Sequence, residues 1–163
     1  MIEICDKVYV GGQYDYELIV SREAGWSVVH ACKEPYHRQA LGYTGRSCSR
    51  DNPEYLFARR GNRLMLNLAD VDDPAWISAQ VIDKAIEFID ERVEAGDDVL
   101  IHCNLGRSRS ASIGLLYLTT KGRYDGLTFL QAEEDFKKLY PLYAPAGGVR
   151  GFCLANWGRY REH

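Results

Sequence analysis

Short apolar runs alternate along the chain with stretches of helical periodicity. The apolar runs end at glycine or polar residues, which is typical of buried strands. In the clearest helical stretch, apolar side chains recur every three or four positions, at Ile82, Ile86, Ile89 and Val93. This alternation predicts an α/β fold in which helices cover a central sheet.

The pattern places each element along the chain. We expect strands at residues 7–10, 27–31, 63–68 and 99–102. We expect helices at residues 14–24, 76–95, 127–140 and 150–161, with a strongly apolar helix after Gly106 at the centre of the domain. Residues 33–62 have little periodicity, and we expect a short helix at 53–59 with Asp51 or Asn52 as its N-cap.

Size and composition fit one soluble globular domain over residues 1–163, with 46% hydrophobic and 26% charged residues. A formal net charge of -3 argues against a general nucleic-acid binder, so no nucleic-acid partner is expected. No apolar run approaches the roughly 20 residues of a membrane-spanning helix, and we expect no membrane insertion. The N-terminus lacks a secretory leader pattern, and the five scattered cysteines suit reduced thiols, which favours a cytoplasmic location.

The segment VLIHCNLGRSRS at residues 99–110 carries the clearest chemistry. It has the pattern of a strand, a loop and a helix N-terminus, with Cys103 before the loop and Arg109 after it. Amides of such a loop and the helix N-terminus form an anion site, and Gly106 permits the backbone angles that the loop needs. An arginine in the first helical turn can hold two phosphate oxygens with its rigid fork.

These surroundings predict that Cys103 is a thiolate nucleophile and that Ser110 donates a hydrogen bond to its sulfur. His102 is expected to point away from the substrate and to support the loop backbone. A purely structural cysteine would be expected within an apolar strand rather than at the start of such a loop. The predicted phosphate-binding residues are Asn104, Leu105, Gly106, Arg107, Ser108 and Arg109.

The motif His-Cys-x5-Arg-Ser, here HCNLGRSRS, resembles the signature of the protein tyrosine phosphatase superfamily, and GRSRS resembles its dual-specificity branch. Residues 7–12 are similar to the family's opening strand and residues 88–103 to its approach to the loop. Residues 129–145 and 151–152 resemble its C-terminal helices. The resemblance implies a central, mostly parallel sheet of four or five strands flanked by helices, no metal cofactor, and phosphomonoester hydrolysis through a cysteinyl-phosphate intermediate.

Attack by a thiolate on phosphorus requires a general acid to protonate the departing oxygen, and a carboxylic acid on a nearby loop is the usual donor. The sequence LADVDDPAW offers Asp70, Asp72 and Asp73. We favour Asp70, because it directly follows a predicted strand and strand ends position side chains reproducibly. Asp72 stays open as the alternative, and Asp73 before Pro74 suits a helix cap.

A phosphorylated protein or peptide is the expected substrate. Residues 33–63 contain seven basic and three acidic residues, which fits either a solvated loop with scattered charge or a segment that recruits an acidic or multiply phosphorylated substrate. A phosphoinositide, an RNA 5′-phosphate, and a binding-only pseudophosphatase remain the alternatives. Cys32 ends a strand that should finish near the catalytic loop, which suggests a reversible disulfide with Cys103 as a further hypothesis.

Overall fold

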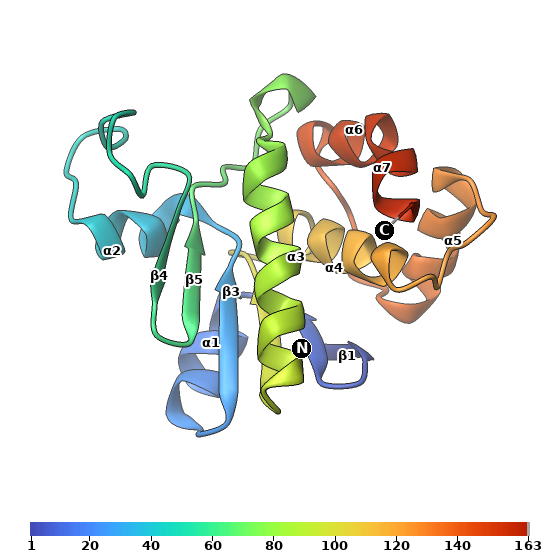
Figure 1. Ribbon diagram of the computed structural model, residues 1–163, viewed down its shortest axis with the longest axis horizontal. Helices are drawn as coiled ribbons and strands as arrows, with labels where there is room; N and C mark the ends of the chain where they lie inside the picture. Colours follow the sequence, from blue (N-terminus) through green and yellow to red (C-terminus); the bar gives the residue numbers. More distant parts are fainter. Residues whose placement is uncertain (163) are drawn as a thin grey trace.

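A central mixed sheet organises the molecule (Figure 1). The computed structural model describes residues 1–162, and within them the sheet has six strands in the order β1-β2-β6-β3-β5-β4. The strands are β1 (Ile2–Cys5), β2 (Val8–Gly11), β3 (Trp26–His30), β4 (Phe57–Arg60), β5 (Arg63–Leu66) and β6 (Asp98–His102). The inner four run parallel, while β1 and β4 pair antiparallel at the two edges.

The predicted α/β class and mostly parallel sheet are confirmed, with six strands over the described residues rather than four or five. Both added strands lie at sheet edges and are partly exposed, so neither forms an apolar run. The helix predicted at residues 53–59 is wrong, because residues 57–60 form β4 instead. Gly61, with φ of 61°, turns the chain so that β4 pairs with β5 and buries Ala58.

Apart from α2, which the sequence pattern did not predict, the helices lie where they were expected but differ at their ends. They are α1 (Gln13–Leu18), α2 (Arg38–Leu41), α3 (Ala79–Glu94), α4 (Arg109–Thr120), α5 (Phe129–Leu139), α6 (Gly147–Ala155) and α7 (Trp157–Arg161). The single last helix predicted at residues 150–161 is two helices, which meet at Asn156. Short 3₁₀ turns extend α1 and precede α3, so both α-helices are shorter than expected.

Helices cover both faces of the sheet. Figure 1 shows α3 lying along the sheet with α4 beside it, and α5, α6 and α7 form an outer layer next to α4. Along β6, Val99 and Ile101 face the main core, whereas Leu100 faces α1 together with Val28 and Tyr16. Because α4 lies between the sheet and the helices around it, it is buried from its first residue almost to its last, as its apolar sequence predicts.

The carboxyl ends of the parallel strands meet at one edge of the sheet. Backbone hydrogen bonds join the segments that leave them: Ala31 N donates to His102 O, and Lys33 N donates to Leu68 O. In an α/β sheet this edge is where loops converge to form a binding site. The segment with Cys103 leaves β6 here and leads directly into α4.

Candidate active site

The loop between β6 and α4 is held from two sides. Gly106 has a φ of 75°, and a Cβ at this position would lie 2.7 Å from the Gly11 carbonyl carbon, so a side chain cannot be accommodated. On the other side, the Tyr140 hydroxyl donates a 2.6 Å hydrogen bond to the Gly106 carbonyl. The β2–α1 turn and the end of α5 therefore fix the loop backbone between them.

Cys103 lies at the base of this loop, 2% exposed. Its Sγ is 3.2 Å from the Ser110 Oγ, which is also 3.2 Å from the carbonyl oxygen of Gly11. A thiolate can only accept, so the hydroxyl then donates to sulfur. A thiol can donate to Oγ instead, which leaves the hydroxyl proton for Gly11. Ser110 can therefore satisfy both protonation states of the sulfur.

The surroundings of Cys103 favour the thiolate. Burial by itself raises the pKa of the Cys103 thiol. Hydrogen bonds from the Ser110 hydroxyl and amide and from the Gly106 amide oppose burial, as does the Arg109 guanidinium. Together they hold the pKa of the thiol below its ordinary value, as a nucleophile at neutral pH requires.

Arg109 is the first residue of α4 and is 8% exposed. Its Nη1 donates to the Leu68 carbonyl at 2.9 Å and its Nη2 to the Asn104 Oδ1 at 2.7 Å. Its Nε is buried and has no hydrogen-bond partner among the residues described. A buried donor of this kind is costly to leave unsatisfied, and an anion in the adjacent pocket would satisfy it.

Each of the other predicted phosphate-binding residues has a distinct environment. Besides accepting from Arg109, Asn104 donates through Nδ2 to Gln13 Oε1 and to the Glu34 carbonyl. Leu105 is 76% exposed on the rim. Arg107 lines the pocket, and its carbonyl accepts a hydrogen bond from the backbone after α5.

The three candidate acids lie in different surroundings. Asp70 lines the same pocket as Cys103, and its Oδ1 accepts a 3.2 Å hydrogen bond from the Ser108 hydroxyl. Asp72 is exposed and does not line this pocket. Asp73 accepts from the amide of Ala75 and caps the 3₁₀ turn before α3, so the cap predicted for Asp73 is found on that turn rather than on α3 itself.

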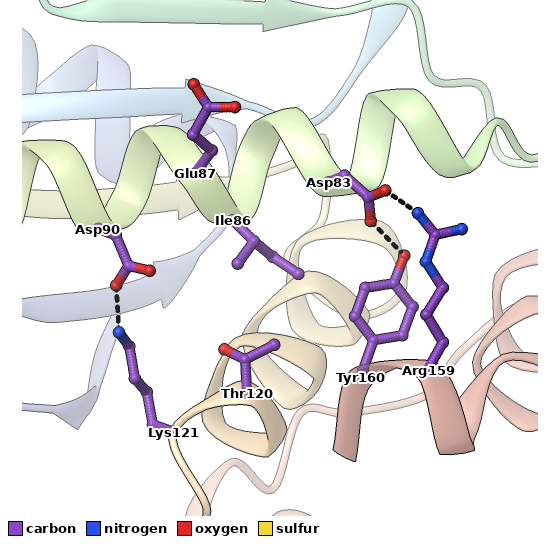
Figure 2. Close-up of a pocket in the computed structure, with 8 residues that line it drawn as sticks. All are labelled: Asp83, Ile86, Glu87, Asp90, Thr120, Lys121, Arg159 and Tyr160. Carbon is purple, nitrogen blue, oxygen red and sulfur yellow. Dashed lines mark hydrogen bonds and ion pairs between the residues drawn. The ribbon is translucent and has the colours of Figure 1, made fainter. Parts of the chain in front are cut away.

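The pocket formed by these groups has a volume of about 430 Å³. It brings together the Cys103 thiol, the Arg109 guanidinium and the Asp70 carboxylate, with residues 144–146 as an opposite wall. A larger cavity of about 580 Å³ lies between α3, α4 and α7 (Figure 2). Its lining residues include no cysteine or histidine, and ion pairs Asp83–Arg159 and Asp90–Lys121 cross it. The smaller pocket is therefore the candidate active site.

His102 has the expected orientation, with its Nδ1 3.1 Å from the Cys103 carbonyl oxygen rather than in the pocket. Cys32 is buried beside the site, and burial raises the pKa of its thiol to about 12. Over residues 1–162, no group of three or more His, Cys, Asp or Glu residues is arranged to hold a metal ion. None of the helices in this part of the chain has both the length and the apolar character needed to cross a membrane.

Several contacts of the site involve residues that sequence reasoning did not assign to it. The carbonyls of Gly11 and Leu68 accept from Ser110 and Arg109. Residues 144 and 146 donate backbone hydrogen bonds to the Arg107 carbonyl and to the Ser108 hydroxyl. The Gly11-Gly12 pair after a strand was a detectable signal, whereas the family resemblance extends to residue 145 without giving residues 144–146 a role in the site.

Comparisons with known proteins agree with this geometry. The family model described as the dual specificity phosphatase catalytic domain matches residues 41–131. Dual specificity protein phosphatase 1 of Arabidopsis thaliana is 39% identical over 66 residues, which are 40% of this chain and 32% of that protein. Dual specificity protein phosphatase PHS1 from the same plant is 33% identical over 82 residues, 50% of this chain and 8% of that protein. The aligned parts thus span only a minor share of these relatives.

Solved structures share the fold at low sequence identity. The match to the crystal structure of DUSP15 covers 99% of this chain and 90% of the DUSP15 chain, with a TM-score of 0.67 and 19% sequence identity. A second match is the crystal structure of human tyrosine phosphatase-like serine/threonine/tyrosine-interacting protein. This match covers 97% of this chain and 95% of the chain in that structure, with a TM-score of 0.64 and 19% sequence identity. Since the family match extends over more than half of the sequence and includes the loop that begins at Cys103, the chain belongs to the dual specificity phosphatase catalytic domain family.

Proposed function

We propose that this protein hydrolyses phosphomonoesters on phosphorylated proteins or peptides through a cysteinyl-phosphate intermediate. One observation carries the proposal: a thiol of lowered pKa, a buried unpaired guanidinium donor and a carboxylate line the same 430 Å³ pocket. Each group fits one requirement of the reaction, which needs a nucleophile, an oxyanion holder and a proton donor. Family membership supports the same reading.

In the first step, the Cys103 thiolate attacks phosphorus while Asp70 protonates the departing alcohol or phenol oxygen. In the second, water attacks the cysteinyl-phosphate, and the Asp70 carboxylate accepts a proton from that water. Ser110 then donates to the sulfur as it leaves, since its Oγ is within hydrogen-bond distance. Arg109 and the amides of residues 104–109 bind the three equatorial oxygens, on which charge accumulates.

The basic segment at residues 33–63 reaches the site but keeps less free charge than its sequence suggests. Its first residues contact the catalytic loop, because the Glu34 carbonyl accepts from Asn104. Three of its arginines are in ion pairs, which are Arg38–Glu34, Arg60–Glu54 and Arg59–Glu91. Arg46 and Arg50 are exposed, and these are the charges that an acidic substrate would meet.

The test is turnover of p-nitrophenyl phosphate and of phosphotyrosine and phosphoserine peptides by the wild-type chain and by Cys103→Ser. We expect Cys103→Ser to lose activity by at least about a thousandfold. It should still bind inorganic phosphate, because Arg109 and the loop amides remain. A wild-type chain that binds phosphate but hydrolyses none of these substrates would indicate a binding-only module. Turnover of phosphoinositides or RNA 5′-phosphates alone would instead assign one of those substrates.

A further inference from the structure

Three side chains form a hydrogen-bonded row that ends at the backbone of the nucleophile. Arg63 Nε lies 2.9 Å from His30 Nε2, His30 Nδ1 lies 2.6 Å from His102 Nε2, and His102 Nδ1 lies 3.1 Å from the Cys103 carbonyl oxygen. The parallel pairing of β3 with β6 sets His30 directly opposite His102. Arg63 begins β5, the next strand in the sheet, and reaches His30 along the same face.

We call these three side chains and the Cys103 carbonyl the Arg63–Cys103 row. The groups at its two ends determine which ring nitrogen of each histidine carries the proton. Arg63 Nε can only donate, so His30 Nε2 must accept and His30 carries its proton on Nδ1. His30 Nδ1 therefore donates to His102 Nε2, which leaves the His102 proton on Nδ1, where it meets a carbonyl that can only accept. A second proton on either histidine would turn its accepting nitrogen into a donor. That N–H group would then face the N–H group of its neighbour in the row. The row is thus satisfied only when both imidazoles are neutral and each is protonated on Nδ1.

The surroundings keep both rings neutral. His30 and His102 are fully buried, and burial holds the pKa of His30 well below its ordinary value and lowers the pKa of His102 to about 4. The rings of Tyr16 and Tyr36 pack against both imidazoles. Tyr16 stacks on His102 and meets His30 edge-on, whereas Tyr36 stacks on His30 and meets His102 edge-on.

Charged side chains border this aromatic enclosure, and Arg63 Nε contacts His30 directly. Arg63 lies over the Tyr16 ring, and the Tyr36 hydroxyl donates to Glu17. Asp15 and Glu17 favour protonation of His102, but burial outweighs both.

We propose that Arg63 and His30 are positioning residues, which hold His102 in the Nδ1–H tautomer and thereby fix the peptide that follows Cys103. If His30 instead presented its Nδ1 lone pair, His102 would have to carry its proton on Nε2, and the Nδ1 lone pair of His102 would then face the Cys103 carbonyl. That peptide begins the phosphate loop, so its rotation would disturb the amides that stabilise the thiolate. The effect on turnover rests on the proposed function, whereas the tautomer itself does not.

Nitrogen-15 NMR of the histidine rings tests the proposal directly. In the wild-type chain at pH 7, we expect both His30 and His102 to give the Nδ1–H pattern. His30→Phe keeps a ring in the enclosure but removes both nitrogens, and Arg63→Met keeps the apolar stem but removes the donor. We expect Arg63→Met to give His102 a measurable Nε2–H population, because His30 without its donor can carry its proton on Nε2 and accept from His102 through Nδ1. His30→Phe leaves His102 Nε2 without a partner, while the Cys103 carbonyl still accepts from Nδ1–H. Tyr36→Phe keeps its ring and lies outside the row, so it should leave the His102 tautomer unchanged.

The chemical consequence is measured by alkylation of Cys103 with iodoacetamide across pH. In His30→Phe and Arg63→Met, we expect the thiol pKa to rise by about half a unit to one unit, because the loop amides stabilise the thiolate less well. We expect kcat/KM for p-nitrophenyl phosphate to fall about fivefold, the size of one lost hydrogen bond. Tyr36→Phe should change neither.

An Nε2–H pattern for His102 in the wild-type chain would overturn the proposal, as would an unchanged tautomer and thiol pKa in Arg63→Met. Should His30→Phe fail to fold, the wild-type spectrum and Arg63→Met still decide. A wild-type chain without phosphatase activity that keeps both Nδ1–H patterns would contradict the proposed function alone.

Discussion

Two carboxylates two positions apart, Asp70 and Asp72, differ in what they can reach. Asp70 lines the pocket and accepts a hydrogen bond from Ser108, while Asp72 is exposed away from it. We expect Asp70→Asn to lower kcat by about a hundredfold for a phosphoserine peptide, whose leaving group needs a proton. The loss should be smaller for p-nitrophenyl phosphate, because its leaving group departs readily without protonation.

Asp72→Asn is the matched control, since it makes the same change of charge on the same loop. Its kcat for both substrates should stay close to that of the wild-type chain. The opposite result, with the leaving-group dependence in Asp72→Asn alone, would assign the general acid to Asp72.

At the scale of residues, the sequence predicted the candidate reactive groups and the contact of Cys103 with Ser110, but not the backbone carbonyls that accept hydrogen bonds at the site. The spacing of Cys103 and Arg109 and the glycine between them express a local chemistry that a short segment can specify. Two backbone acceptors at the site are the carbonyl of Gly11 at the end of β2, which accepts from Ser110, and the carbonyl of Leu68 after β5, which accepts from Arg109. Backbone carbonyls occur at every residue, so only tertiary packing decides which of them face the site.

Among the elements, α6 supports the loop that carries Asp70. The Gly148 amide donates a 2.9 Å hydrogen bond to the Val71 carbonyl, and a Cβ on Gly148 would lie 2.2 Å from that oxygen. Gly151, one turn later, lies close against Pro74 in the same way. Glycine at these positions therefore lets the loop approach the helix backbone.

We expect Gly148→Ala to displace the acid loop and to lower kcat for a phosphoserine peptide about tenfold to a hundredfold. Alkylation of Cys103 should be unchanged, because Cys103 and the amides that bind its sulfur belong to the segment from the end of β6 to the start of α4. Gly158→Ala in α7 is the control, since a Cβ there meets nothing within 4 Å. A Gly148→Ala variant with wild-type kcat would show that this contact does not position the acid.

The burial of individual strands explains where the predicted fold was right and where it was wrong. The inner strands are buried on both faces, so each forms an apolar run that the sequence displays. The edge strand β4 contains only one fully buried residue, Ala58, and its pairing depends on the turn at Gly61. A local pattern over residues 53–59 could not reveal that pairing, because the partner strand supplies its hydrogen bonds.

For the molecule as a whole, three buried histidines make stability depend on pH. Burial lowers the pKa of His30, His37 and His102, the last from 6.5 to about 4. In the unfolded chain these rings take up protons near pH 6.5, whereas in the folded chain they stay neutral to lower pH. Between those values the unfolded state binds more protons, so the free energy of unfolding must fall as the pH falls.

We expect urea denaturation to give a free energy of unfolding that decreases from pH 7 to pH 5, with about 2 kcal/mol of the decrease due to His102 alone. His102→Asn should reduce the slope in this window, because it removes one of the groups that titrate there. Glu91→Gln should leave the slope unchanged, since the Arg59 partner holds the pKa of Glu91 at about 2, and its contribution is lost only below pH 5. If stability were constant from pH 7 to pH 5, the rings would take up protons in the folded chain as readily as in the unfolded chain, and burial would not keep the Arg63–Cys103 row neutral below pH 6.5.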